Sequence, residues 1–206
     1  MNKFALLAVL LMGVSVAWAD QPTVINCNVE YAYEGDEAVT LFNLPDGSGS
    51  PFTEAHLPDG TIVDATLRVQ ILDAYNNPVA FFPAEDLWLE SVDGALAICI
   101  GGTIADEDTD ENGWTVWAEP LGASGHSQSR CTLLVSGMYA QGWVNLDLRF
   151  NSADINGDGA VNLADLGLFS SYYYGAYTFE ADLFFDGALN LVDVAYFARG
   201  AGTSCP

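Results

Sequence analysis

The sequence predicts a mainly β fold, an antiparallel β-sandwich at residues 20–150 followed by a small α-helical domain at residues 151–206. Two observations support this. Up to residue 150, short segments of alternating apolar and polar residues are separated by turns rich in glycine, proline and asparagine. Beyond residue 150 the apolar spacing becomes three or four residues, which is typical of helices. Hydrophobic residues make up 50% of the chain, enough for a packed core.

Residues 1–19 have the features of a secretory signal peptide. Lys3 precedes an apolar run at residues 4–16, and the sequence AWA at residues 17–19 has the small-x-small pattern of a cleavage site. The run is short for a membrane span and is interrupted by Gly13. We therefore expect cleavage after Ala19 and a secreted chain that is not inserted in a membrane.

The charge balance is strongly acidic. Lys and Arg number 5 against 28 Asp and Glu, which gives a net charge of −23 at pH 7 with His neutral. Nucleic-acid binding needs cationic side chains, so this class of partner is excluded, and anionic membrane surfaces are disfavoured. The same balance suits a protein kept soluble by self-repulsion or one that gathers divalent cations.

The strands of the first domain are expected where apolar residues alternate. In TLRVQILDA, at residues 66–74, Leu67, Val69 and Ile71 occupy alternate positions. Further candidates are AVTLF at 38–42, DLWLESV at 86–92, WTVWAE at 114–119, CTLLVSG at 131–137 and VNLDLRF at 144–150. Many short strands without helical periodicity predict a sandwich.

The chain has four cysteines, an even number that predicts disulfides in an exported protein. No two cysteines are close enough in sequence to resemble a zinc motif. Three pairings are possible, and the sequence does not rank them. Our preferred pairing joins Cys99 to Cys131 within the sandwich and Cys27 to Cys205 across the two ends.

The second domain contains a repeated loop. The segment DINGDGAVNLAD at residues 154–165 recurs as DLFFDGALNLVD at residues 182–193, and an amphipathic helical pattern follows each. In a twelve-residue calcium loop, oxygens come from positions 1, 3 and 5, the position-7 carbonyl, position 9 through water, and an acid at position 12, with glycine at position 6. An asparagine- and aspartate-rich turn that caps a helix is the alternative. Repetition in register favours calcium.

The expected ligands follow from these positions. The first loop offers Asp154, Asn156, Asp158, Ala160, Asn162 and Asp165. The second loop offers Asp182, Asp186, Ala188, Asn190 and Asp193. Its position 3 is Phe184, which has no oxygen, so we expect the second site to bind calcium about tenfold more weakly or worse.

The helices after the loops should each have one apolar face. Leu163, Leu166, Phe169 and Tyr173 mark this face in the first helix. Leu191, Val194 and Phe197 mark it in the second helix.

The paired loop–helix pattern at residues 151–202 resembles a dockerin domain, an EF-hand-like module that binds cohesin domains in a calcium-dependent manner. The resemblance implies two calcium ions and a protein partner. Dockerins commonly carry Ser or Thr just before the position-12 aspartate, whereas this chain has Leu163-Ala164 and Leu191-Val192. A cohesin-like partner is therefore less well supported than calcium binding.

A second resemblance covers residues 66–135. VQILDAYNNPVAFFPAEDLWLESVDG at 69–94 and TDENGWTVWAEPLGASGHSQSRCTLLV at 109–135 are similar to bacterial immunoglobulin-like (Ig-like) domains of the invasin/intimin type. In that family a strand ends in Asp, a short turn and PV, and a later TD-x-x-G turn opens another strand. The resemblance implies a spacer module and an extracellular or cell-surface location in a bacterium.

A third acidic stretch, DTDENGWTVWAE at residues 108–119, also fits the written pattern of a calcium loop. Its second half alternates like a strand, and Pro120 stands where a helix should begin. We therefore expect a β-turn within the sandwich here, not a calcium site.

The sequence gives little support for an enzyme. It has no Gly-x-Ser-x-Gly elbow, His-Glu-x-x-His helix or glycine-rich phosphate loop, and its two histidines, His56 and His126, lie in polar, turn-rich stretches. We expect satisfied or solvated surface histidines and a non-catalytic module for extracellular assembly. The alternative is a carbohydrate-binding or polysaccharide-degradation accessory protein. Tryptophans in an exposed row would favour it, and the candidates are Trp88, Trp114, Trp117 and Trp143.

Overall fold

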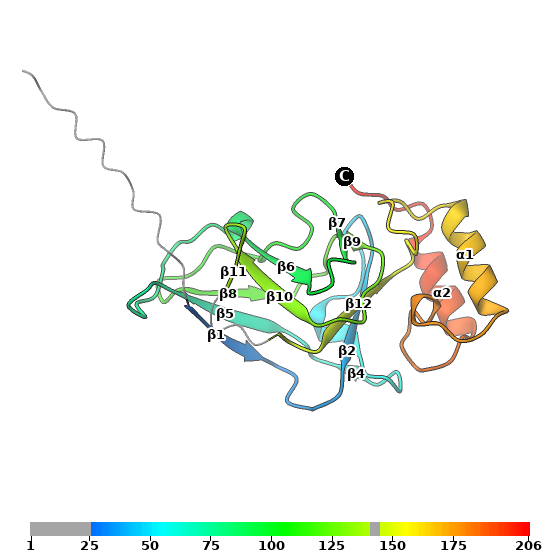
Figure 1. Ribbon diagram of the computed structural model, residues 1–206, viewed down its shortest axis with the longest axis horizontal. Helices are drawn as coiled ribbons and strands as arrows, with labels where there is room; N and C mark the ends of the chain where they lie inside the picture. Colours follow the sequence, from blue (N-terminus) through cyan, green and yellow to red (C-terminus); the bar gives the residue numbers. More distant parts are fainter. Residues whose placement is uncertain (1–25, 141–144) are drawn as a thin grey trace, which may run out of the picture.

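The computed structural model describes residues 26–140 and 145–206. The predicted signal peptide at residues 1–19 and Trp143 lie outside these ranges. Among the described residues the fold is mainly β, with two short α-helices near the C-terminus. Figure 1 shows the strands gathered in one β body, the described residues from 26 to 152, with both helices side by side at one end of it.

The β body contains three sheets and a short strand pair. The first sheet has the order β1 (Asn26–Tyr31), β5 (Leu67–Leu72), β8 (Trp114–Trp117). The second has the order β11 (Met138–Tyr139), β10 (Cys131–Val135), β6 (Leu87–Ser91). The third has the order β12 (Leu148–Ser152), β2 (Val39–Asn43), β3 (Ala55–His56), β4 (Ile62–Val63). The pair is β7 (Ala97–Ile98) with β9 (Ala123–Ser124), and the 3-10 turns are η1 (Phe52–Glu54), η2 (Ala84–Asp86) and η3 (Phe179–Ala181).

Each segment expected to be a strand contains one, because alternation places apolar side chains on the inner face. In β5, Leu67, Val69 and Ile71 are fully buried, while Arg68 between them is exposed. They pack in one core with Leu87 and Leu89 of β6 and further side chains from all three sheets.

The prediction of an antiparallel sandwich is wrong at the pairing of β12 with β2, and an isolated bridge between Leu44 and Gly122 is parallel too. β12 lies parallel to β2, with Phe150 opposite Leu41. Parallel strands end at the same edge of a sheet, so the segments after β2 and β12 enter the same space. Leu44 follows β2 and Ala153 follows β12, and both are buried in a second core beneath the helices.

The helices form where the repeated pattern predicts them. α1 (Leu163–Tyr173) and α2 (Leu191–Gly200) contact each other through stacked rings of Phe169 and Phe197, whose centroids are 4.9 Å apart. These rings belong to the second core together with Phe42 and Leu44 of the β body. The helical segment therefore shares a core with the β body. No helix in the described part of the chain is long and apolar enough to cross a bilayer.

The apolar helix faces are buried only in part. Phe169 and Phe197 are buried as expected, but Leu163 is 82% exposed and Leu191 is 77% exposed. The helices are short and make this contact about 1.7 turns after they begin, so their first turns project beyond the contact. The residues predicted to be core at these turns are surface residues instead.

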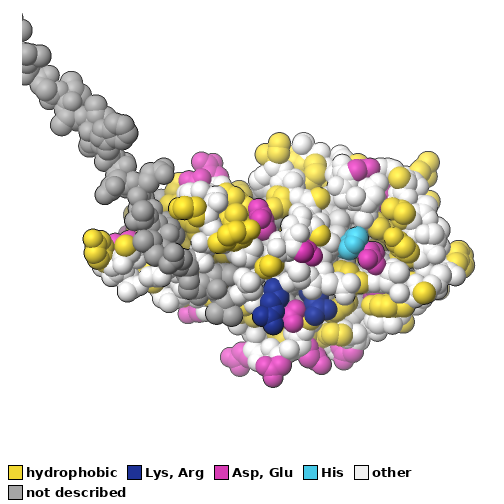
Figure 2. Space-filling view, viewed as in Figure 1, with side chains coloured by type: hydrophobic (Ala, Val, Ile, Leu, Met, Phe, Trp, Pro, Cys, Tyr) yellow, Lys and Arg dark blue, Asp and Glu magenta, His cyan; other side chains and the backbone are white. Residues whose placement is uncertain are grey.

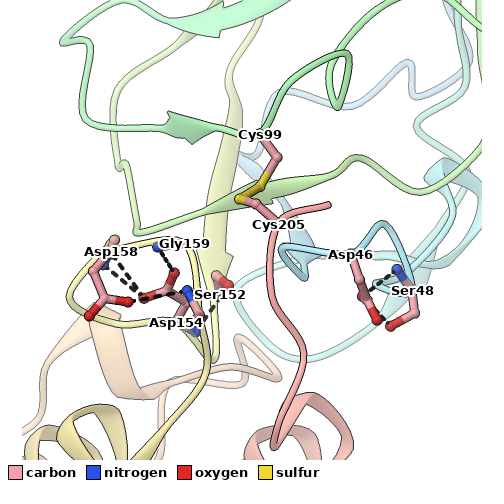
Figure 3. The surroundings of a disulfide bond; sticks show 10 residues. Asp46, Ser48, Cys99, Ser152, Asp154, Asp158, Gly159 and Cys205 are labelled. Atoms are coloured by element: carbon pink, nitrogen blue, oxygen red, sulfur yellow. Dashed lines mark hydrogen bonds between the residues drawn. A yellow bond between two sulfur atoms is a disulfide. The ribbon is translucent and has the colours of Figure 1, made fainter.

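Both preferred disulfides are wrong, because Cys99 is bonded to Cys205 with a Cα–Cα distance of 5.4 Å. The C-terminal tail turns back after α2 and runs to the β body, where Cys99 follows β7 (Figure 3). Cys131 instead begins β10 in the fully buried centre of the β core, and Cys27 of β1 is buried in that core too. The tail's return path therefore decides the pairing.

Candidate calcium-binding loops

The first loop begins directly after β12 and ends inside α1. Asp154 is fully buried, and its carboxylate accepts hydrogen bonds from the backbone N–H groups of Gly157 (2.9 Å), Asp158 (3.3 Å) and Gly159 (2.7 Å). The chain thus winds around this carboxylate. Gly159 has φ +90°, a left-handed conformation that favours glycine, which explains the glycine at position 6.

The last position of the first loop closes it. Asp165 is fully buried in the first turn of α1, and its two oxygens accept from Asn156 N (3.2 Å) and Asn162 N (2.9 Å). Asn162 caps the helix by accepting from Ala164 N (2.8 Å) and also donates from Nδ2 to the Ala160 carbonyl (3.0 Å). Asn156 Nδ2 reaches Asp158 Oδ2 (3.0 Å). All six predicted positions therefore belong to one hydrogen-bonded loop.

The second loop repeats this plan. Asp182 is fully buried and accepts from Asp186 N (3.1 Å) and Gly187 N (2.9 Å). Asp193 is fully buried in α2 and accepts from Phe184 N (3.1 Å) and Asn190 N (2.8 Å).

The other three predicted ligands of the second loop bond to one another. The Asn190 amide Nδ2 donates to Asp186 Oδ2 (3.0 Å) and to the Ala188 carbonyl (3.3 Å). The equivalence of the two loops extends to both helix caps, each of which is a capping box.

The two loops differ most at position 3, which is Phe184 in the second loop. Its ring lies against the ring of His56 in the β body, with centroids 4.7 Å apart, and against Tyr196 at 5.5 Å. A Cβ at Gly60 would lie 2.7 Å from the Phe184 ring, so glycine is required for this close approach. Position 3, which is the oxygen-bearing Asn156 in the first loop, is thus used for packing in the second.

Two further side chains bond to Asp182 of the second loop. The Tyr177 hydroxyl donates to Asp182 Oδ2 (2.8 Å), and Asn151 Nδ2 of β12 donates to the Asp182 carbonyl (2.7 Å). Burial, followed by repulsion from Asp186, raises the pKa of Asp182. Burial, followed by repulsion from Asp182 and Asp186, raises the pKa of Asp193.

Within the described ranges, no ion pair gives the buried aspartates a cationic partner. The ion pairs of the described residues are Arg68–Glu30, His126–Glu180 and Arg149–Asp147, and none includes a loop aspartate. Burying a carboxylate without a counter-charge is costly. A bound cation would remove that cost, so the donor set of the first loop fits a hard divalent ion such as calcium.

In this conformation, no three His, Cys, Asp or Glu side chains of the described residues converge into a metal-holding group. The loop carboxylates instead accept backbone N–H groups, and a carboxylate oxygen that does so keeps a further lone pair for a cation. The first loop supplies oxygens at every expected position, whereas the second lacks one at Phe184.

The third acidic stretch forms a turn, as predicted. Asp110 Oδ1 accepts from Asn112 N (2.7 Å) and Trp114 N (2.9 Å), and β8 begins at once. No helix follows to return a position-12 carboxylate to the turn.

The three candidate tryptophans within the described residues do not form a row. Trp117 is fully buried, Trp114 of the first sheet lies under the Arg68 guanidinium at 4.9 Å, and Trp88 belongs to the second sheet.

His56 corrects the expectation of a solvated surface histidine. It is only 1% exposed and lies 3.4 Å from the Tyr196 hydroxyl, and burial lowers its pKa. The sequence around it gives no indication of this, because its partners lie far along the chain. The sequence Pro58-Asp59-Gly60 is typical of a turn but does not indicate the close contact of Gly60 with Phe184.

Comparison with known proteins adds little to this geometry. No family model matches the chain, and no curated protein matches it. One matching solved structure is the crystal structure of the Lin-41 filamin domain, at 16% identity and a TM-score of 0.30, covering 62% of this chain and 96% of that one. The fold is therefore described from the chain's own strands and helices.

Proposed function

We propose that this chain is an exported, non-catalytic module that binds calcium in both loops, more weakly in the second, and docks a protein partner through its helices. In this proposal the β body is an Ig-like spacer, and the helical segment is dockerin-like. The supporting observation is the pair of loops in which Asp154, Asp165, Asp182 and Asp193 are fully buried without cationic partners.

In the first loop, Asp154, Asn156, Asp158, the Ala160 carbonyl, Asn162 through water, and Asp165 would hold the ion. Calcium would supply the positive charge that these oxygens lack and would fix the start of α1 against β12. The chain's own residues order the loop backbone, because Asp154 and Asp165 already accept hydrogen bonds from the loop N–H groups.

The exposed apolar residues at the starts of both helices support docking. Leu163 and Leu191 occupy equivalent positions before the two position-12 aspartates. A shallow groove of about 280 Å³ between the helices is lined by Leu166, Phe169, Ser170, Tyr173, Tyr174, Leu191 and Val194. Figure 2 shows apolar side chains exposed at the helical end of the molecule. The partner that fits is a protein with an apolar patch rimmed by basic residues, since this chain has a net charge of −23. A cohesin-like domain would be one such partner.

Calorimetric titration with calcium tests the metal sites. We expect two binding steps in the full mature chain. In Asp165→Ala the stronger step should weaken by at least about tenfold, equal to about 1.4 kcal/mol, because a ligand and two loop hydrogen bonds are lost. The matched control is Asp110→Ala, which alters the acidic turn in the β body and should leave both steps unchanged. If only Asp110→Ala reduced binding, the assignment of calcium to the helical segment would be wrong.

Docking is tested by capture from the secreted fraction of the source, with calcium and with chelator. A protein captured only with calcium should be lost with Leu163→Asp and Leu191→Asp. Tyr75→Asp changes an equally exposed apolar residue of the β body and should not affect capture. Equal loss in all three variants would contradict docking through the helices.

A carbohydrate-binding role has one observation in its favour. A groove of about 590 Å³ on the β body is lined by Trp88 together with Glu85, Ile98, Ile100 and Thr103. An indole ring beside a carboxylate can stack on and hydrogen-bond a sugar. Affinity electrophoresis with soluble polysaccharides, comparing the native chain with Trp88→Ala, tests this alternative, which predicts retardation that the substitution abolishes.

A further inference from the structure

The C-terminal tail after α2 pairs with the first calcium loop. Gly202 N donates to the Val161 carbonyl (3.0 Å), Val161 N donates to the Thr203 carbonyl (2.9 Å), and Cys205 N donates to the Gly159 carbonyl (2.8 Å). Ala160 and Ser204 form the bridge between these bonds. Figure 3 shows the tail carrying Cys205 beside the loop that holds Asp154, Asp158 and Gly159.

This pairing surrounds the one backbone ligand of the first loop. Ala160 is position 7, whose carbonyl is expected to coordinate the ion. The bonds to Gly159 and Val161 hold the backbone on both sides of Ala160, and Ala160 N donates to Asp158 Oδ1 (3.1 Å). The direction of the Ala160 carbonyl is therefore set by the tail as well as by the loop.

The tail is itself fixed to the β body. Cys205 is bonded to Cys99, which is buried and whose N–H donates to the Gly122 carbonyl (3.2 Å). A Cβ at Gly159 would lie 3.3 Å from the Cys205 sulfur, so the disulfide is in direct contact with the loop. Among the described residues, the equivalent part of the second loop, residues 187–189, has no such backbone pairing with another segment.

We infer that residues 202–205, anchored by the Cys99–Cys205 disulfide, are a positioning element that raises the calcium affinity of the first loop. This inference rests on the proposed calcium function. A tail held in place aligns the Ala160 carbonyl before the ion arrives, so less ordering remains to be done on binding. Linkage requires the reverse as well: calcium in the first loop holds the tail against it.

The test is calorimetric titration of the full mature chain with calcium chloride. The first-loop step is identified by its loss in Asp165→Ala. Cys99→Ser releases the tail but leaves its sequence intact, and a chain ending at residue 201 removes the pairing altogether. We expect each to weaken the first-loop step by roughly 5- to 150-fold, the range of ordinary couplings between sites. The second-loop step should not change.

Thr203→Ala is the matched control. It removes the Thr203 hydroxyl, which donates to the Gly200 carbonyl, but keeps the Thr203 carbonyl that pairs with Val161. Its calcium titration should equal that of the native chain.

The outcomes separate this inference from the proposed function. A native chain that binds no calcium overturns both. A native chain that binds calcium, with unchanged affinity in Cys99→Ser and in the shortened chain, overturns the inference alone. Equal weakening of both loops would mean that the tail merely stabilises the fold, and this result also overturns it. If Cys99→Ser does not fold, Cys205→Ser provides the same comparison from the tail side.

Discussion

The two loops share a backbone plan but are attached to the β body by different means. The first is attached through backbone groups: Gly125 N donates to the Asp154 carbonyl (2.9 Å), and Cys205 N donates to the Gly159 carbonyl (2.8 Å). The second is attached mainly through a side chain, the Phe184 ring inserted beside His56 and above Gly60.

The difference has a consequence for metal binding. Attachment through backbone groups leaves every ligand side chain of the first loop available to a cation. Attachment through Phe184 uses a position whose counterpart, Asn156, carries an oxygen. Under the proposed calcium function, the second loop gives up one ligand for its contact with the β body. We therefore expect it to combine weak calcium binding with strong packing.

The largest effect should follow calcium removal. The segment 151–206 is small, and domains of this size usually need metals, disulfides or a partner to offset chain entropy. Emptying the loops would leave the buried aspartates without a counter-charge, and in the second loop Asp182 and Asp186 repel Asp193. We expect chelation to remove hydrogen-exchange protection from α1 and α2, so that their opening free energies fall toward zero, while β5, β6 and β10 stay protected.

The measurement is hydrogen exchange by mass spectrometry on the full mature chain, with and without chelator, and far-ultraviolet circular dichroism reports the helical content in parallel. Magnesium at equal ionic strength is the control for non-specific charge screening. Unchanged protection of both helices after calcium removal would show that the shared core and the disulfide suffice to fold this segment.

The next effect should come from Phe184→Asn, which gives the second loop the residue type found at position 3 of the first. We expect its calcium affinity to rise about tenfold, because a missing oxygen ligand is restored. The same change removes the ring packed against His56 and Tyr196 and should lower the free energy of unfolding by about 1–3 kcal/mol for a half-buried ring. Calorimetry and thermal melting measure the two effects separately.

Phe184→Leu is the matched control, because it keeps an apolar side chain and adds no oxygen. It should retain weak calcium binding and cost less stability than the asparagine. Equal calcium affinity in the two variants would mean that the absent oxygen does not limit the second loop.

Most local features of this molecule could be predicted from the sequence. The alternation of Leu67, Val69 and Ile71 and the loop positions of Asp154 and Asp165 are read within a dozen residues, because strand pairing faces and helix caps depend on near neighbours. Both helices follow from such patterns, and so do six of the strands, β2, β5, β6, β8, β10 and β12.

Features that depend on distant segments could not be predicted. Cys99 and Cys205 are 106 residues apart, and their pairing depends on the turn that the tail makes after α2. Helical spacing predicts one apolar face with Leu163 and Phe169 on α1, but the position of α2 decides that Phe169 is covered and Leu163 is exposed. The parallel pairing of β12 with β2 likewise requires knowledge of where the chain leaves the β body.

The smallest expected effect concerns pH at the contact between His56 and Phe184. His56 is buried against aromatic rings, and burial lowers its pKa from the ordinary value of 6.5, although Glu54 nearby opposes the shift. The other polar group facing it is the Tyr196 hydroxyl. Because the unfolded chain takes up this proton before the folded chain does, the contribution of His56 is fully present above pH of about 6.5 and is lost as the pH falls.

Thermal melting at saturating calcium between pH of about 7.5 and 5.5 measures this loss. We expect the native chain to lose more stability on acidification than His56→Leu, which keeps an apolar contact with Phe184 and cannot be protonated. When Phe184→Asn is already present, adding His56→Leu should not change the pH slope further if the acid effect acts through the packing of the second loop. A pH slope that persists unchanged in His56→Leu would place the acid-sensitive group outside the His56–Phe184 contact. Acid sensitivity would then not distinguish the second loop from the first.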